Sequence, residues 1–217
     1  LYVRQGKLAE ALPLYVQAVE LIKQSLGESD SEYATSLNNL ALLYDQLDQH
    51  ECAEPLFIEA LKILKEQLGE QHPTYAAGLC NLGETYQAQK NYPMAKQLFL
   101  QALEIRKLVL GEAHPHYAHS LLKLADLYRE QGEQSQAEPL YLQARDVAAQ
   151  SLGERHPDYA AIACRPHVMI GDNVKKMFAD APEVVERAHV GAALRIMRVK
   201  AVWDVGGWSN RVKPGRN

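Results

Sequence analysis

The chain has 217 residues, with 23 lysines and arginines against 27 aspartates and glutamates, and a formal net charge of −4. Residues 1–164 are net acidic and residues 165–217 are net basic. An acidic first part argues against nucleic acid as the main partner, because phosphates require basic neighbours. The sequence contains no apolar run of the ~18 residues that a membrane span needs, so we expect no membrane partner. Three cysteines without Cys-x-x-Cys spacing favour a reducing, cytoplasmic setting.

A Leu-Gly-Glu motif begins at residues 26, 68, 110 and 152, and so recurs every 42 residues. Tyrosines, alanines and large aromatic residues also recur every 42 residues. We call the residues at one position of successive repeats a repeat column. These columns are Tyr33, Tyr75, Tyr117 and Tyr159; Ala11, Ala53, Ala95 and Ala137; Ala18, Ala60, Ala102 and Ala144; and Tyr15, Phe57, Phe99 and Tyr141. A fixed period of this length predicts a stack of similar units rather than one globular core.

Each unit is predicted to contain two helices. Apolar residues at 37, 40, 41 and 44 keep one stripe on a helix of 3.6 residues per turn, and a second stripe runs from Ala53 to Leu64. The polar stretch 46–50 separates them. Because glycine tolerates the backbone that ends a helix, we expect the second helices to stop at Gly69, Gly111 and Gly153.

The next helices are expected to begin at prolines, since proline favours the first helical position. These prolines are Pro73, Pro115 and Pro157. The first junction carries Asp30 instead, which we expect to cap the helix that follows. Three of the four junctions also carry a histidine before the proline, in one repeat column, which suggests a capping or packing role for His72, His114 and His156.

The chain is expected to begin inside a unit. Leu1-Tyr2 stands at the repeat position of Leu43-Tyr44, so most of the first helix of unit one is absent. We therefore expect an exposed apolar face at the N-terminal end, through which the chain could associate with itself.

The repeat is expected to end near residue 164. A fifth unit starts at residues 156–160, but Pro166 would break its helix. We assign residues 165–217 to a divergent basic tail with a helix near 182–203, capped by Asp180. Our hypothesis is that this helix packs over the last unit; the alternative is an unrelated appendage.

These residues resemble a known family. The small-residue and aromatic pattern resembles a tetratricopeptide repeat. The period and Leu-Gly-Glu-Ala-His-Pro-His-Tyr-Ala at 110–118 are similar to the longer variety of kinesin light chains, as are Leu-Asn-Asn-Leu-Ala at 37–41 and Ala-Glu-Pro-Leu at 53–56. The resemblance covers residues 1–164: a partial first unit, three full units and the start of a fifth. It implies an all-α fold, a right-handed α-solenoid of stacked antiparallel helix pairs.

The resemblance also implies a binding groove, lined by the first helix of each pair, that holds partner peptides. Carried over column by column, the groove residues are Asn38, Asn39, Leu42, Asp45, Asn81, Glu84, Gln87, Lys123, Asp126 and Arg129. Kinesin-light-chain grooves that take acidic peptides carry basic residues, whereas acidic residues prevail here. This departure favours a ligand of basic or mixed charge. The alternative is that these side chains form merely solvated helix faces.

The sequence favours no enzyme and no cofactor. His114, His116 and His119 have the spacing of metal ligands, but His114 belongs to the repeat column. Cys80 is a small, partly apolar residue whose presence does not require a catalytic role, and the carboxylates are scattered along helix surfaces.

The leading hypothesis is a protein–protein interaction adaptor that binds a peptide in the groove. The alternative is a regulatory or structural segment of a larger protein, for example beside a nucleotide-binding domain.

Overall fold

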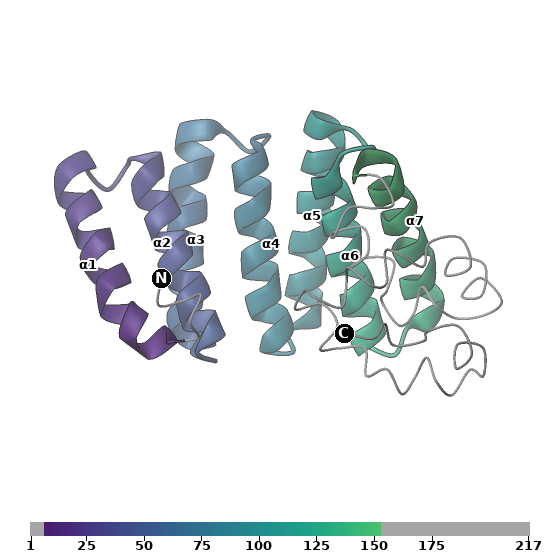
Figure 1. Ribbon diagram of the computed structural model, residues 1–217, viewed down its shortest axis with the longest axis horizontal. Coiled ribbons are helices and arrows are strands. Elements are labelled where there is room, and N and C mark those ends of the chain that lie inside the picture. The colour runs from purple at the N-terminus through teal and green to yellow at the C-terminus, as the bar shows by residue number, and fades with distance from the viewer. Residues whose placement is uncertain (1–6, 153–217) are drawn as a thin grey trace, which may run out of the picture.

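The computed structural model describes residues 7–152, and this part of the chain consists of seven helices without a strand. The helices are α1 (Leu8–Leu26), α2 (Ser31–Gln46), α3 (His50–Leu68), α4 (Pro73–Ala88), α5 (Tyr92–Leu110), α6 (Pro115–Glu130) and α7 (Gln134–Leu152). They stand side by side in chain order (Figure 1). The predicted all-α repeat solenoid is confirmed, and α1 occupies the same repeat position as α3, α5 and α7.

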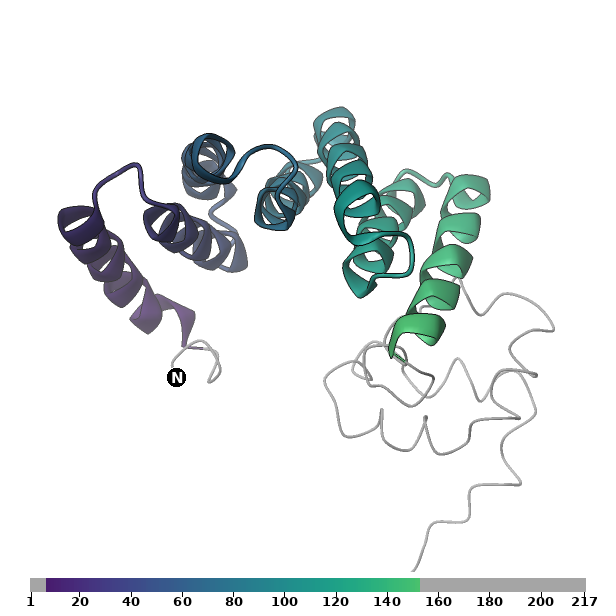
Figure 2. The same cartoon turned by 90° about the horizontal axis from the view of Figure 1, so that it is seen from above.

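The stack is curved. Seen from above, the helices follow an arch (Figure 2). Each helix packs chiefly on its neighbours in sequence, and in addition α2 contacts α4 and α4 contacts α6. The second helices α3, α5 and α7 approach one another less closely. The first helix of each pair therefore lies on the shorter, inner side of the arch.

The ends of the helices lie where the sequence predicts them. Gly27, Gly69 and Gly111 follow α1, α3 and α5 with φ of 90°, 83° and 83°, a conformation that costs glycine little. The Asp30 carboxylate accepts a hydrogen bond from the Glu32 N–H at 2.7 Å and so caps α2. Pro73 and Pro115 occupy first helical positions.

The repeated histidines are helix caps. His72 Nδ1 accepts a hydrogen bond from the Thr74 N–H at 3.2 Å, and His114 Nδ1 accepts one from the His116 N–H at 3.1 Å. Each histidine thereby satisfies a backbone donor that the first turn of a helix leaves without a partner. The predicted capping role of His72 and His114 is confirmed.

Each glycine junction also carries an ion pair. Lys23 Nζ lies 2.8 Å from Glu28, and Lys107 Nζ lies 2.7 Å from Glu112; Lys65 and Glu70 pair in the same way. The hydrogen bond and the charge of Glu28 raise the pKa of Lys23. Because these pairs are exposed, each contributes little to stability.

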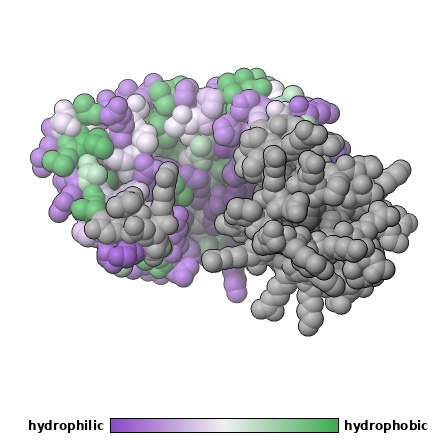
Figure 3. Space-filling view, viewed as in Figure 1, coloured by the Kyte–Doolittle hydropathy of each residue, from purple (hydrophilic) through white to green (hydrophobic). Residues whose placement is uncertain are grey.

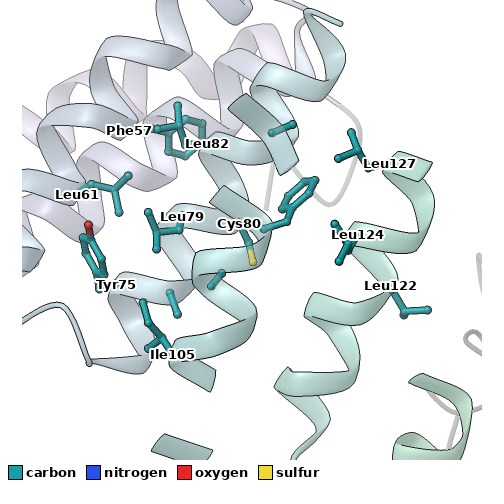
Figure 4. Close-up of a cluster of buried hydrophobic side chains, with 14 of the residues drawn as sticks. Phe57, Leu61, Tyr75, Leu79, Cys80, Leu82, Ile105, Leu122, Leu124 and Leu127 are labelled. Atoms are coloured by element: carbon teal, nitrogen blue, oxygen red, sulfur yellow. The ribbon is translucent and has the colours of Figure 1, made fainter. Parts of the chain in front are cut away.

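Alanines and large aromatic rings alternate in the core between the helices. Ala53, Phe57 and Ala60 of α3 are buried, and so are their counterparts Ala95, Phe99 and Ala102 of α5. Leu79 and Leu82 of α4 belong to the same cluster (Figure 4). A Cβ atom on Gly83 would lie 2.6 Å from the Phe99 ring, so glycine lets α4 and α5 approach closely there.

Several predictions fall outside the described residues. These are the start of a fifth unit at 156–160, the helix stop at Gly153, the helix start at Pro157 and the basic tail 165–217 with its capping helix near 182–203. Within residues 7–152, no helix has the combination of length and apolar character that crossing a bilayer requires.

Candidate binding face

The ten residues predicted to line a groove lie on three helices. Four belong to α2, three to α4 and three to α6. We call the exposed and half-buried side chains of these three helices on the inner side of the arch the inner face. Since α2 contacts α4 and α4 contacts α6, side chains from successive units meet there.

Hydrogen bonds connect α2 with α4. Asn81 Nδ2 donates to Asn38 Oδ1 at 2.9 Å, and Thr85 Oγ1 donates to Asp45 Oδ2 at 2.6 Å. The other oxygen of Asp45 lies 2.8 Å from His50 Nδ1, at the start of α3. Three predicted residues, Asn38, Asp45 and Asn81, are therefore held in place by partners from a neighbouring unit or the next helix.

An ion pair connects α4 with α6. Lys123 Nζ lies 2.7 Å from Glu84 Oε2. The side chain of Lys123 is 21% exposed and that of Glu84 is 42% exposed, so the pair stands at the surface of the inner face. It neutralises one acidic and one basic member of the predicted set.

Asp126 of α6 also has partners within the chain. Its Oδ1 atom accepts a hydrogen bond from the hydroxyl of buried Tyr141 at 2.5 Å and lies 3.7 Å from Arg129 Nη2. Asp126 therefore links α6 to α7 through Tyr141. Of the remaining predicted residues, Asn39 is exposed, and Leu42 and Gln87 are half-buried.

Three residues of this region were missed by reasoning from the sequence: Thr85, His50 and Arg106. Thr85 is fully buried and His50 is half-buried beside Asp45. Arg106 of α5 is 5% exposed and stands in the repeat column of Leu64. The sequence could have identified Arg106, because it is a charged residue in a repeat column whose other members are apolar.

Arg106 reaches the first two turns of α6. Its Nη1 atom donates to Ser120 Oγ at 2.7 Å and to the His116 carbonyl at 3.1 Å, and it lies 3.4 Å from His119 Nδ1. Burial, and then the charge of Arg106, lower the pKa of His116. The buried guanidinium therefore adds a positive charge close to the first two turns of α6.

The cysteine and histidine side chains do not form a reactive cluster in the described part of the chain. Cys80 is buried (Figure 4), and this burial raises the pKa of its thiol. No group of three metal-binding side chains occurs in residues 7–152. His114 and His116 have ring centroids 5.1 Å apart, but His114 is engaged as a helix cap.

Solved structures with a similar fold come from repeat proteins. A putative kinesin light chain with nearly identical TPR-like repeats from Podosopora anserina is 24% identical, with a TM-score of 0.65, and the match covers 92% of this chain and 91% of that one. BtubC (BKLC) from P. vanneervenii is 21% identical, with a TM-score of 0.67, and the match covers 100% of this chain and 80% of that one. The apo form of RapI is 19% identical, with a TM-score of 0.63, over 86% of this chain and 65% of that one.

Sequence comparison agrees with the structural likeness. Comparison with curated proteins gives no match. The family model described as tetratricopeptide repeat matches residues 1–66, 46–108 and 74–150, which together span most of the chain. The chain therefore belongs to the tetratricopeptide repeat family, and its fold is similar to that of the repeats of the putative kinesin light chain.

Proposed function

We propose that the inner face of the array binds a peptide segment of a protein partner, and that the chain acts as an adaptor without catalytic activity. The repeat family makes the chain a protein-interaction scaffold. One observation supports the inner face as the binding surface: polar side chains of three successive units converge there and pair across the helices. Such a strip offers donors and acceptors at regular intervals to an extended chain.

The charge of the inner face supports a ligand of mixed charge. Asp45 and Glu84 have partners within the chain, in His50 and Lys123, so both carboxylates are already engaged before a ligand binds. A peptide with both basic and acidic residues fits this arrangement, because either side chain of the Glu84–Lys123 ion pair can exchange its partner for a ligand group. Several modest contacts of this kind along the array would give the affinity.

A peptide array tests the proposal. The variant carries Asn38→Ala, Asn81→Ala and Glu84→Gln together, and the matched control carries Lys62→Gln and Glu66→Gln on exposed positions of α3. We expect the inner-face variant to lose most peptide binding and the control to keep it. Equal binding by the two variants would rule out the inner face as the site.

The exposed face of α1 favours a second candidate, a structural segment that packs on another surface. Leu21 is 65% exposed, whereas its counterpart Ile63 is 6% exposed. Leu14 and Leu26 are exposed as well, and a hydrophobic patch covers part of α1 (Figure 3). In this candidate the face is covered by a second copy of the chain or by another part of a larger protein.

Light scattering tests this second candidate. Self-association through α1 predicts a dimer that becomes a monomer when Leu21 is changed to Glu. A monomer at all concentrations would exclude the second copy and leave only a larger protein as the occupant.

The free thiols of Cys52 and Cys80 support a reducing, cytoplasmic location, which cell fractionation would check.

A further inference from the structure

A row of apolar side chains runs along the outer side of the arch, on the second helices. They stand in one repeat column: Val16, Ile58, Leu100 and Leu142. The first three are 39%, 48% and 43% exposed, and the fourth is half-buried. Of the ten large hydrophobic side chains that are exposed in residues 7–152, six lie on α3 and α5 and the other four lie on α1. The outer sides of α3 and α5 therefore carry apolar surface that the described helices do not cover.

α3 and α5 form the crown of the arch. Figure 2 shows both helices on its convex edge, whereas α1 and α7 lie at the two ends. A second convex surface that approaches the array therefore meets α3 and α5 first. Apolar surface gathered on one exposed side of a folded protein commonly marks an interaction site.

Charged residues of opposite sign follow the apolar row by one turn. Lys62 follows Ile58 on α3, and Glu104 follows Leu100 on α5. Residues four apart lie on the same side of a helix, so each charge stands beside its apolar neighbour. Lys62 and Glu104 are both exposed, and neither takes part in the ion pairs of residues 7–152, which include those at the glycine junctions. One repeat column therefore presents a cation on α3 and an anion on α5.

This arrangement is complementary to a second copy of itself. α3 and α5 run in the same direction, because α4 between them runs in the opposite one (Figure 1). A two-fold axis parallel to both helices and midway between them exchanges α3 with α5. In such a contact residue i meets residue j, and residue j meets residue i. Lys62 of each copy then faces Glu104 of the other, and Ile58 faces Leu100.

We propose that two copies of the chain associate back to back through the outer sides of α3 and α5. Ile58 and Leu100 of both copies form the apolar centre of the contact. Two symmetric ion pairs between Lys62 and Glu104 flank this centre and fix the register of the helices, since opposite charges discriminate between alternative registers.

The contact is small, and the dimer is therefore weak. At the next turn Glu66 of one copy faces Leu108 of the other, which is not complementary, and two convex surfaces diverge away from their crowns. Contacts below the standard interface size are transient, so we expect a dissociation constant on the order of 10–100 μM. In more dilute solution the chain is a monomer, in which Ile58 and Leu100 contribute little to the free energy of unfolding.

The back-to-back arrangement leaves the inner faces open. They lie on the opposite side of each array from the contact and point away from each other in the dimer (Figure 2). A dimer of this kind goes beyond the proposed function, because it carries two peptide sites and so connects two partner molecules.

Sedimentation equilibrium of the full chain at increasing concentration tests the contact. Lys62→Glu and Glu104→Lys should each raise the dissociation constant about tenfold, because each substitution places like charges at both symmetric pairs. The double variant, in which the two charges are exchanged, should recover the affinity of the unchanged chain. Glu20→Lys is the matched control, with the same change of net charge as Glu104→Lys at the same repeat position of α1, and should leave the dissociation constant unchanged.

Three results would overturn the proposal. A chain that stays monomeric up to about 1 mM does not form the contact. A double variant as weak as the single ones shows that Lys62 and Glu104 do not face each other. A dimer that Leu21→Glu abolishes and the single charge reversals leave intact assembles through α1 instead.

These measurements separate the contact from the proposed function, because none of them uses a peptide. Loss of the dimer in the single variants with unchanged peptide binding is the expected combination, since the contact and the inner face lie on opposite sides of the array. Because Lys62 and Glu104 are exposed, the variants are expected to fold, which a thermal melt would verify.

Discussion

The junction between α2 and α4 and the junction between α4 and α6 occupy the same place in successive units, yet different chemistry connects them. An amide pair and a carboxylate–hydroxyl hydrogen bond join the first. An exposed ion pair joins the second, and a buried guanidinium lies behind it. The core columns beneath the two junctions are nearly identical. The repeat positions that carry the same residue type in every unit therefore determine the packing. The positions whose residue differs between units determine which polar side chains each junction presents.

The largest expected effect on stability concerns the buried phenylalanine that the two junctions have in common. Phe57→Ala and Phe99→Ala should each lower the free energy of unfolding by about 3–5 kcal/mol, because each removes a fully buried ring. Urea denaturation measures both. The exposed neighbours Ile58 and Leu100, changed to alanine, should have little effect. A large difference between the two phenylalanines would show that the cores are not equivalent.

A smaller effect is expected at the first junction. Asp45→Ala removes the acceptor of buried Thr85 and the partner of His50, which should lower the free energy of unfolding by about 1–3 kcal/mol. Glu66→Ala on the exposed side of α3 is the control. If thermal melts of the two variants coincide, the hydrogen bonds across this junction do not stabilise the array.

At the second junction we expect a substitution to raise the free energy of unfolding rather than lower it. Arg106→Leu restores the residue of the repeat column and removes an uncompensated buried charge, so we expect the free energy of unfolding to rise by about 1 kcal/mol. The melting temperature would increase by about 2–4 °C, as calorimetry can measure. A lower melting temperature than that of the unchanged chain would mean that the hydrogen bonds of Arg106 outweigh its burial.

The smallest effect is expected for the ion pair of the second junction. A double-mutant cycle with Glu84→Gln and Lys123→Met should give a coupling of about 0.2–1 kcal/mol, because both side chains are partly exposed. The coupling should decrease in high salt, which screens exposed charges. A coupling that salt leaves unchanged would indicate that the pair is effectively buried.

The helices and their ends followed from the sequence because their causes are local. A glycine after α3, a proline at the start of α4 and an aspartate before α2 act within a few residues of themselves. The ends of the helices can therefore be predicted from the sequence of a single unit, and the 42-residue period predicts the same ends in the other units.

The contacts of the inner face could not be predicted in the same way. Asn38 bonds to Asn81 and Asp45 bonds to Thr85 because side chains of neighbouring units meet at a particular angle. A column identifies the face of a helix but not the partner on the next helix. Arg106 stood out as an exception in its column, yet its reach to Ser120 depends on the direction of a long side chain.

The stacking of each helix on its neighbours has a consequence for local opening. α1 is packed against the array mainly through α2, whereas α4 is held by α3 and α5 and touches α2 and α6 as well. Units of this kind open from an end, since interior units must break two interfaces at once. Amide hydrogens of α1 should therefore exchange with deuterium faster than those of α4, and the array would loosen from α1 inward, in the manner of a zipper.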